Sequence, residues 1–319
     1  MGLGSVGAVS VPHRFPRRAF DETTLAERTS TVAAVLVARN EAVTIARALE
    51  PLHALRERRL VDRLVVVDGG SDDDTVALAA AAGAEVIDAA SVRPELGPVL
   101  GKGDSIWRTL VAVDVDILAF LDADLVGRYD EYVIGLLGPL LTDADVRFVK
   151  GAFRRTRAGE VEPRHLDGGR VTEMVARPLL NLLRPDLAAF YQPLGGQVAA
   201  RRGDLAAIEI PTGYAVEIDM LAAMVDRFGH RAVVESDLGR VVNRERTVED
   251  LVPMAQEVMY GLLHAQQPGL SWTPYVRPEP EGGMGVPLAH QIVHRPPAAS
   301  LLQVSGDGAG SRRRDMGSS

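Results

Sequence analysis

The amino-acid sequence contains no cysteine in 319 residues. This absence excludes disulfides, thiolate nucleophiles and zinc sites with cysteine ligands, and it leaves the redox compartment open. Long apolar runs are also missing, because aspartates interrupt the most hydrophobic region at positions 114, 116, 122 and 124. A membrane-spanning helix needs about 20 consecutive apolar residues, so the sequence predicts no transmembrane segment.

Basic residues are fewer than acidic ones: the sequence has 35 Lys and Arg against 43 Asp and Glu, which gives a net charge of −8. Nucleic-acid binding would need a basic face, which this composition does not suggest. Near the N-terminus the arginines follow the apolar residues, the wrong order for a signal peptide. Myristoylation would need Ser or Thr where Val6 stands. We therefore expect a cytoplasmic protein that binds no nucleic acid.

The composition that is present, 46% hydrophobic and 24% charged, is typical of a globular enzyme with a sizeable core. Apolar, β-branched runs predict strands at 32–38, 63–68, 84–88 and 116–124. Helical spacing of apolar residues predicts intervening helices at 39–58, 75–82 and 101–113. This alternation predicts an α/β fold with a Rossmann-like, mostly parallel sheet.

After residue 142 the alternation weakens, although a strand within 146–157 and a helix within 213–229 are still expected. We divide the chain into a flexible N-terminal arm (1–24), an α/β part (25–142), a second part (143–298) and a disordered tail (299–319). The arginines of the basic segment, at 154, 155 and 157, are expected to form a solvated face.

Polar side chains follow three of the predicted strands. Asp122-Ala123-Asp124 ends the fourth strand, Asp68 ends the second, and Arg39-Asn40-Glu41 follows the first. In parallel α/β sheets, ligands bind at the carboxyl ends of the strands, so these groups point to one crevice.

Asp122 and Asp124 are candidates for holding a divalent cation. Residues two apart in an extended segment point the same way, and Ala123 keeps the backbone slim. Mg²⁺ and Mn²⁺ prefer carboxylate oxygens and are often coordinated by substrate phosphates at the same time. The alternative is a turn with two solvated aspartates that cap the next helix.

Two glycine-containing turns have similar alternatives. In "DGGSDDDT", Asp68 could contact a base or ribose while the amides bind an anion, or the residues could simply form a turn and helix cap. In "GKGDS", the phosphate-loop pattern fails at Leu96 and Gly103, but Lys102 between two glycines is a plausible phosphate contact.

Three further features concern an acceptor or a metal. Arg170 and Thr172 in "GGRVTE" suit an anionic acceptor at a helix N-terminus, or else form a surface arginine and a cap. Glu217 lies amid apolar residues, so it should either pair with a cation or act on substrate. His290 and His294 have the spacing of metal ligands, but no third ligand accompanies them, which favours coincidence.

Seven segments together resemble, in the same order, one known family. That family is the actinobacterial glucosyl-3-phosphoglycerate synthases with their mannosyl-3-phosphoglycerate synthase relatives, and the resemblance runs from about residue 25 to 298. The segments are "VARNE", "VVVDGGSDDDT", "GKGDSIWRTL", "FLDADL", "GGRVTEMVARPLL", "QPLGGQ" and "GYAVEI".

The resemblance implies a GT-A fold and a retaining, metal-dependent glycosyltransferase. It would move glucose from UDP-glucose to the 2-hydroxyl of 3-phosphoglycerate, with Mg²⁺ or Mn²⁺, as a homodimer. Residues 25–142 would bind the nucleotide sugar, and residues 143–298 would bind the acceptor and form the dimer.

The resemblance also implies roles for particular residues. The candidate catalytic residues are Lys102, Asp122 and Glu217. The nucleotide sugar would contact these three together with Ala38, Arg39, Asn40, Glu41, Asp68, Ser71, Ala123, Leu194 and Tyr214. Gly169, Arg170 and Thr172 would hold the acceptor, and Asp124 and Asn243 would hold the metal.

Two positions depart from the family pattern. Asn243 stands where the family carries a metal-binding histidine, and an amide oxygen is a weaker ligand for a transition metal. Gln197 stands where the family typically has Glu, near the sugar. A mannosyl transferase using GDP-mannose and a catalytically weakened homologue therefore remain alternatives. A nucleotidylyltransferase is disfavoured, because "VARNEA" lacks the Gly-rich, lysine-containing loop of those enzymes.

Overall fold

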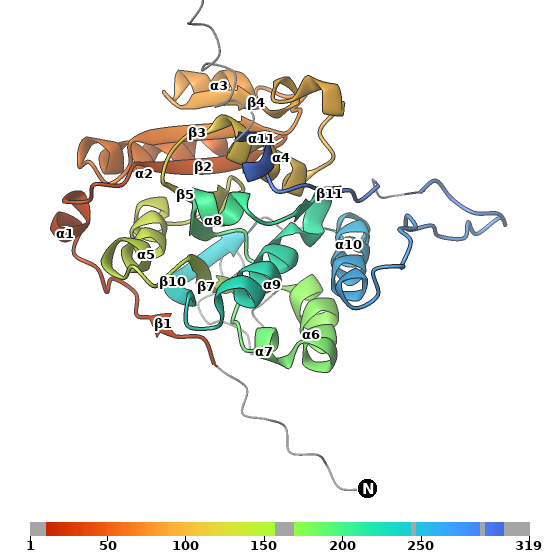
Figure 1. The fold of residues 1–319 in the computed structure, drawn as a ribbon. Helices are drawn as coiled ribbons and strands as arrows, with labels where there is room; N and C mark the ends of the chain where they lie inside the picture. Colours follow the sequence, from red (N-terminus) through yellow and green to blue (C-terminus); the bar gives the residue numbers. More distant parts are fainter. Residues whose placement is uncertain (1–10, 157–168, 244–246, 288–290, 303–319) are drawn as a thin grey trace, which may run out of the picture.

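The computed structural model describes residues 11–156, 169–243, 247–287 and 291–302. They form a nine-stranded mixed sheet in the order β1-β10-β7-β8-β5-β2-β3-β4, with β6 paired to β10, and helices cover the sheet (Figure 1). The predicted fold class, α/β with a mostly parallel sheet, is confirmed.

The first half of the sheet is parallel and follows the predicted alternation. Strands β2 (Val32–Ala38), β3 (Arg63–Asp68), β4 (Glu85–Asp88) and β5 (Ile117–Asp122) alternate with α2 (Ile45–Glu57), α3 (Thr75–Ala81) and α4 (Lys102–Ala112). The predicted helix at 39–58 begins six residues later, because residues 39–44 form the loop after β2. Short 3₁₀ turns, η1 (Ala89–Ser91) and η2 (Pro94–Leu96), precede α4.

The second half extends the same sheet. Strand β8 (Val198–Arg201) lies antiparallel between β5 and β7 (Phe148–Thr156), and β10 (Val233–Asn243) runs parallel to β7. The short strand β6 (Leu125–Val126) pairs antiparallel with the end of β10. The boundary predicted at residue 142 therefore does not separate two sheets.

The helices of the second half surround this extension. They are α5 (Tyr129–Thr142), the π-helical turn η3 (Thr172–Ala176), α6 (Arg177–Leu183), α7 (Pro185–Ala188), α8 (Arg202–Ala206), the 3₁₀ turn η4 (Gly213–Ala215), α9 (Val216–Phe228) and α10 (Val248–Gln266). Strands β9 (Ile210–Pro211) and β11 (His294–Arg295) form a separate antiparallel pair, and α11 spans Ala299–Leu302.

The core has two layers, one on each face of the sheet. Along β5, Leu118 and Phe120 join the cluster on one face, whereas Ile117, Ala119 and Leu121 join the other. Since successive strand residues point to opposite faces, both faces must be covered to bury such a run.

Residues 11–24 differ from the flexible arm predicted for them. Strand β1 (Arg14–Phe15) pairs with β10, and Arg14 donates to the buried Glu235 at 2.6 Å. Phe20 packs where a side chain at Gly138 would overlap it, and α1 (Glu22–Ala26) comes next. These contacts are long-range, so local composition did not reveal them. Residues 1–10 lie outside the described part, as do residues 303–319 of the predicted tail.

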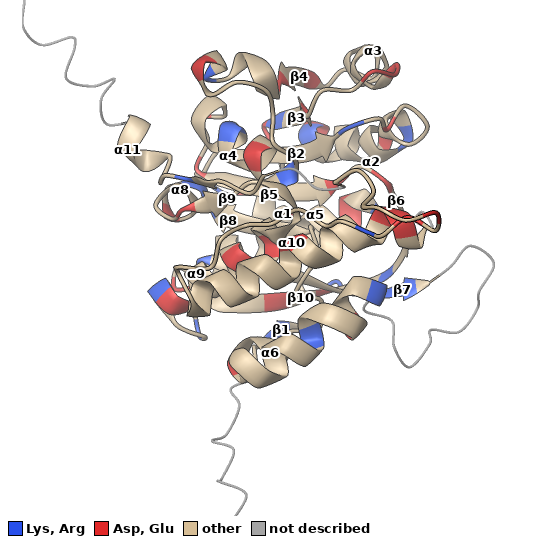
Figure 2. Cartoon of the chain, turned by 90° about the vertical axis from the view of Figure 1, so that its right-hand side faces the viewer, with Lys and Arg blue, Asp and Glu red and all other residues tan. Residues whose placement is uncertain are grey.

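Two surface features complete the fold. Residues 267–287 leave the end of α10 and project from the body at the right of Figure 1. In Figure 2, basic and acidic segments are interspersed over the described chain. Nowhere in 11–156, 169–243, 247–287 or 291–302 does a helix have the length and apolar character needed to cross a membrane. The cytoplasmic location stays a prediction.

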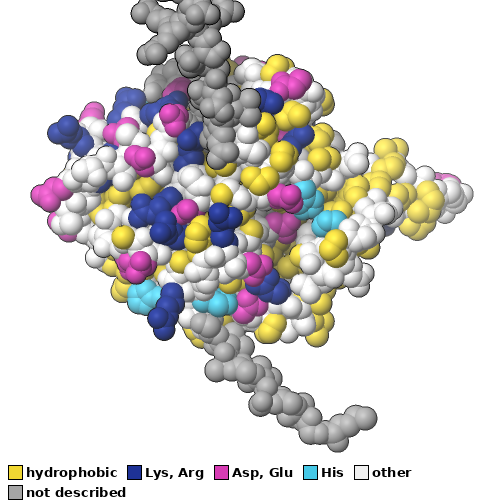
Figure 3. Space-filling model, viewed as in Figure 1, with side chains coloured by type: hydrophobic (Ala, Val, Ile, Leu, Met, Phe, Trp, Pro, Cys, Tyr) yellow, Lys and Arg dark blue, Asp and Glu magenta, His cyan; other side chains and the backbone are white. Residues whose placement is uncertain are grey.

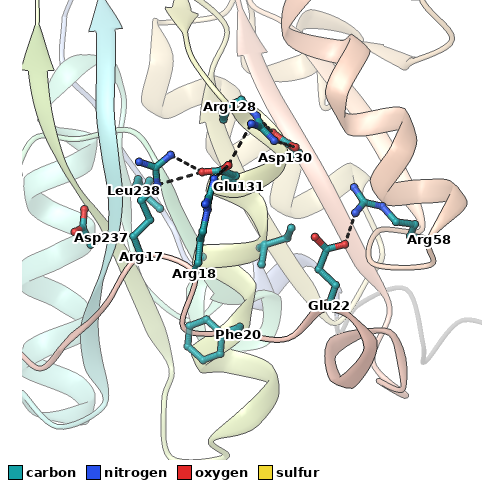
Figure 4. A pocket seen from close by; sticks show the side chains of 12 residues that line it. Arg17, Arg18, Phe20, Glu22, Arg58, Arg128, Asp130, Glu131, Asp237 and Leu238 are labelled. Carbon is teal, nitrogen blue, oxygen red and sulfur yellow. Dashed lines mark hydrogen bonds and ion pairs between the residues drawn. The ribbon is translucent and has the colours of Figure 1, made fainter. Parts of the chain in front are cut away.

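A hollow of about 540 Å³ lies where the N-terminal segment passes the start of α5 (Figure 4). Its arginines are paired with carboxylates: Arg17 and Arg18 with Glu131, Arg58 with Glu22, and Arg128 with Asp130. None of the predicted site residues lines this hollow, so we do not assign the active site to it.

Candidate active site

A partly buried lysine joins two carboxylates at the carboxyl end of β5. Lys102 is the first residue of α4, Asp122 the last of β5, and Glu217 lies in the first turn of α9. Lys102 Nζ donates to Asp122 Oδ1 at 2.5 Å and to Glu217 Oε1 at 2.6 Å. The structure thus brings together the three candidate catalytic residues, the outer two of which are 115 positions apart along the chain.

The charges of this cluster stabilise one another. Burial disfavours the lysine ammonium, but the charges of Asp122 and Glu217 outweigh it and hold the pKa of Lys102 above its ordinary value. Burial likewise works to raise the pKa of Asp122. The ammonium of Lys102 and the donors on its oxygens hold that pKa below the usual range instead. Lys102 and Asp122 are therefore both ionised at neutral pH.

The turn before β8 completes the surroundings of Asp122. Gln197, fully buried, donates from Nε2 to Asp122 Oδ2 at 2.8 Å. Gly196 lies so close that a Cβ there would overlap Asp122 Oδ1. Only glycine fits this approach, and the amide of Gln197 supplies the donor that a glutamate carboxylate would lack.

Lys150 is a second lysine close to this cluster; it is fully buried, and sequence reasoning missed it. Its Nζ donates to the carbonyl of Gly195 at 2.6 Å and so supports the same turn from β7. Burial lowers the pKa of Lys150 to about 8, although nearby carboxylates act in the other direction. The available signal was a lysine within the apolar run "RFVKGAF".

The loops after β2 and β3 are hydrogen-bonded to one another. The backbone N–H of Asn40, in the left-handed region at φ +59°, donates to Ser71 Oγ at 2.9 Å. Asn40 Oδ1 accepts from Asp72 N at 3.0 Å, and Glu41 N donates to Thr75 Oγ1 at 2.7 Å. Predicted nucleotide-binding residues from two strands therefore lie in one connected edge of the sheet.

Other residues predicted for the nucleotide sugar lie around this edge. The carboxylate of Asp68 accepts from Gly70 N, Ser71 N and Ser71 Oγ, so it orders its own turn. Ala38 is buried beneath Gly69, and Arg39 is exposed. Leu194 and Tyr214 are both half-buried, and Ala123 is buried.

Asp124 lies in the turn that connects β5 with β6. Strand β5 ends at Asp122, and Ala123 and Asp124 form a turn before β6, so strand alternation is not what orients Asp124. Burial raises the pKa of Tyr129, and the charges of Asp122 and Asp124 both raise it further. The two carboxylates therefore lie near the same hydroxyl. Pairing of β6 with β10 sets the backbone of Asn243 opposite Leu125, beside Asp124.

The predicted acceptor residues begin a helical segment. Gly169 has φ +92°, Arg170 is exposed in the first turn, and Thr172 is buried at the start of η3. Arg155 differs from the solvated face predicted for it. A Cβ on Gly169 would lie 3.3 Å from Arg155 Nε. Burial works to raise the pKa of Asp122, and the charge of Arg155 adds to the opposing, larger effects of Lys102 and Gln197. Arg155 links the acceptor segment to the cluster.

The remaining metal signals are weak. Within the described ranges, no three His, Cys, Asp or Glu side chains gather as metal ligands. His294 Nε2 lies 3.6 Å from Asp219 Oδ2, and its ring stacks on His264. His290 lies outside the described residues.

A mostly parallel α/β sheet with polar groups at the carboxyl ends of its strands is the arrangement in which such sheets bind ligands, and the comparisons make the protein a glycosyltransferase. The glycosyl transferase family 2 model matches residues 33–193. Glucosyl-3-phosphoglycerate synthase from Mycolicibacterium smegmatis is 42% identical over 233 residues, 73% of this chain and 77% of that protein.

Solved structures agree. The chain matches glucosyl-3-phosphoglycerate synthase from Mycobacterium tuberculosis, in complex with Mn²⁺ and UDP-glucose, with a TM-score of 0.82 and 34% identity over 91% of this chain and 99% of that one. It matches mannosyl-3-phosphoglycerate synthase from Rubrobacter xylanophilus with a TM-score of 0.80 and 35% identity over 91% and 97%. The chain belongs to glycosyl transferase family 2 and, within it, to the family of these synthases. The predicted family and GT-A fold are confirmed.

Replacing Lys102 with Met leaves the buried Glu217 and the partly buried Asp122 without their shared cation. We expect the free energy of unfolding at pH 8 to fall by about 3–5 kcal/mol. The loss should be smaller at pH 5, where one carboxylate can take up a proton. In the unchanged protein the pKa of Asp122 is depressed, so its stabilisation exists above the ordinary aspartate pKa and is lost as the pH falls through the lowered value.

Chemical denaturation at both pH values measures this difference. Arg128→Met is the control, because that exposed arginine pairs with Asp130 at 2.8 Å on the surface, where ion pairs contribute little to stability. An equal loss at pH 5 and pH 8 for Lys102→Met would contradict the assigned charge states.

Proposed function

We propose that this protein transfers glucose from UDP-glucose to the 2-hydroxyl of 3-phosphoglycerate, with retention of anomeric configuration. The observation that carries the proposal is the Lys102 cluster, which meets the acceptor segment through Arg155 at the carboxyl edge of a sheet shared with the synthases. The synthase from Mycobacterium tuberculosis has also been solved with Mn²⁺, UDP and phosphoglyceric acid.

The acceptor position follows from its chemistry. 3-Phosphoglycerate carries one free hydroxyl, on carbon 2, so glycosylation of a hydroxyl on this acceptor is glycosylation there. Its phosphate and carboxylate are anionic. An arginine and the backbone amides of a helix start suit such groups, and Arg170 with residues 169–172 provides both.

Retention is proposed to occur by attack on the face from which the diphosphate leaves. The bond from the anomeric carbon to the diphosphate oxygen breaks, the acceptor oxygen forms the new bond, and its proton passes to the departing phosphate oxygen. Asp122 is engaged by Lys102 and Gln197, and Glu217 by Lys102. These bonds reduce the nucleophilicity of both carboxylates, which favours a route without a covalent sugar–enzyme intermediate.

A divalent ion fits the residues at the end of β5. Mg²⁺ is usually held by one or two carboxylates together with substrate phosphates, so a complete protein cage is not needed. Asp124 would supply a carboxylate, and Asn243, whose backbone lies beside it, an amide oxygen. When bound, Mg²⁺ or Mn²⁺ supplies positive charge to the leaving diphosphate. Lys102 holds Asp122 and Glu217 in fixed positions next to that site.

Two alternatives rest on particular observations. The mannosyl-3-phosphoglycerate synthase from Rubrobacter xylanophilus matches with nearly the same TM-score, which favours GDP-mannose as a second candidate donor. Asn243 offers a neutral amide as a metal ligand, which favours a catalytically weakened homologue as the other.

An assay of 3-phosphoglycerate with UDP-glucose, GDP-glucose, UDP-mannose and GDP-mannose, each with Mg²⁺ or Mn²⁺, tests the proposal. We expect the highest kcat/KM with UDP-glucose, and we expect Asp124→Ala to lose roughly 100-fold or more because the diphosphate charge is no longer neutralised. Preference for GDP-mannose would support the mannosyl alternative. Calorimetric binding of UDP-glucose without turnover would support the weakened homologue.

Arg170→Ala tests the acceptor site. Because the guanidinium is proposed to bind an anionic group of the acceptor, we expect the KM for 3-phosphoglycerate to rise about 10- to 100-fold, the cost of a charge-assisted hydrogen bond. The KM for the nucleotide sugar should change less than threefold. The exposed Arg154, at the end of β7, provides the control variant Arg154→Ala. Unchanged acceptor kinetics would remove Arg170 from the site.

We also propose that the protein is a homodimer, supported by the projecting segment 267–287. Its Met284 and Val286 are 66% and 80% exposed, and Figure 3 shows apolar side chains gathered on this projection. Exposed apolar groups of this kind are typical of interfaces. Met284→Glu with Val286→Glu should weaken dimerisation at least tenfold in analytical ultracentrifugation, whereas Val76→Glu on α3 should not. A monomeric unchanged protein would contradict the proposal.

A further inference from the structure

Glu257 is a buried carboxylate outside the Lys102 cluster. It lies on α10 and is 5% exposed. Its Oε2 accepts the backbone N–H of Tyr214, in η4, at 2.6 Å. The effect of this carboxylate therefore depends on the short turn that it contacts and on the helix into which that turn leads.

The turn contacted by Glu257 lies against the start of α4 and leads into α9, the two helices that carry Lys102 and Glu217. Gly213 has φ +80°, and a Cβ on it would overlap Glu257 Oε2. On its other side, a Cβ on Gly101 would lie 3.1 Å from the Gly213 Cα. The Gly213 backbone is thus enclosed between Glu257 and the residue before Lys102, and only glycine fits there.

The same turn leads directly into α9. Tyr214 donates its N–H to Glu257, and Glu217 comes three residues later in the first helical turn. Fixing the N–H of Tyr214 fixes the start of α9. The start of α9 in turn sets the 2.6 Å contact between Glu217 and Lys102.

The charge of Glu257 is sensitive to pH. Burial raises its pKa to about 7, the Tyr214 N–H opposes this, and the negative charge of Glu217 on α9 adds to it. From η3 and α6, which also pack on α10, Glu173 and Arg177 pair with each other at 3.2 Å. From α9, Asp219 faces α10 near Gly261 and pairs with His294 at 3.6 Å. A carboxylate accepts a stronger hydrogen bond than a neutral carboxylic acid, so the hold on Tyr214 strengthens as Glu257 ionises.

We propose that Glu257 is a positioning residue, which holds the Gly213–Tyr214 turn so that Glu217 meets Lys102 and Tyr214 faces the sugar site. This inference rests on the proposed glycosyl transfer for its kinetic consequence. Its structural consequence, the ordering of the turn by a buried carboxylate, is independent of which substrates are used.

Two variants separate the carboxylate's charge from its hydrogen bond. Glu257→Gln keeps an acceptor for Tyr214 N but does not titrate, and Glu257→Ala removes the acceptor. Glu249→Gln, at an exposed position in the first turn of α10, is the matched control. For each protein, kcat and KM for UDP-glucose and 3-phosphoglycerate are measured from pH 6 to 9, with UDP-glucose affinity measured by calorimetry.

We expect Glu257→Ala to lower kcat/KM for UDP-glucose about 10-fold or more, with the acceptor KM changed less than threefold. In the unchanged protein and in Glu249→Gln, kcat/KM for UDP-glucose should rise through an ionisation near pH 7, which Glu257→Gln should abolish. Kinetic constants of Glu257→Ala within twofold of the unchanged protein, or persistence of that ionisation in Glu257→Gln, would overturn the proposal.

Thermal unfolding supplies a readout that does not depend on turnover. Because the folded-state pKa of Glu257 is raised, the unfolded chain releases its proton first, and the unchanged protein loses stability relative to Glu257→Gln as the pH rises from about 4.5 to 7. The Tm of the unchanged protein minus that of Glu257→Gln should therefore fall between pH 5 and pH 8. A constant difference would overturn the buried-carboxylate assignment, whereas an inactive enzyme in which the difference does fall would place the failure in the proposed function alone.

Discussion

The ion pair of Lys102 with Asp122 and Glu217 is the interaction on which the rest of the site depends. It joins the start of α4, the end of β5 and the start of α9, three elements that share no local sequence signal. Without its partners, each of these charges would destabilise the fold or shift its pKa, because removing an ion from water is unfavourable unless an opposite charge lies close to it. Together they compensate one another and fix the relative positions of the sheet and the α9 helix.

The surrounding structure supports this cluster through close backbone approaches. Gly196 allows the turn before β8 to lie against Asp122, and Gly213 allows the turn before α9 to lie between Gly101 and Glu257. Buried polar side chains, Gln197, Lys150 and Glu257, then bond to these turns or to the cluster itself. The Lys102 cluster is therefore supported by a further layer of hydrogen bonds, which fixes the positions of its side chains.

The two positions that depart from the family pattern, Gln197 and Asn243, lie close to this cluster and to the Asp124 turn. Gln197 donates to an ionised Asp122, so a neutral amide is compatible with the two carboxylates already bound to Lys102. Asn243 ends β10 beside the Asp124 turn because β6 and β10 pair there. Under the proposed function, an amide ligand at that position would leave more of the neutralisation of the diphosphate charge to Asp124 and the bound ion.

Local sequence signals were sufficient for the parallel half of the sheet, since β-branched runs, helical spacing and glycine turns are all short-range patterns. The same short-range patterns predicted where these strands end, and so placed Asp68, Asp122 and Asn40 at or just after the strand ends. The sequence indicated a strand or hairpin within 191–202, where β8 lies, but not its antiparallel place between β5 and β7. It did not reveal β1 or the roles of Lys150, Arg155 and Glu257. These depend on tertiary packing, because burial, charge pairing and backbone contact between distant segments are set by what lies against a residue. No local periodicity records that information.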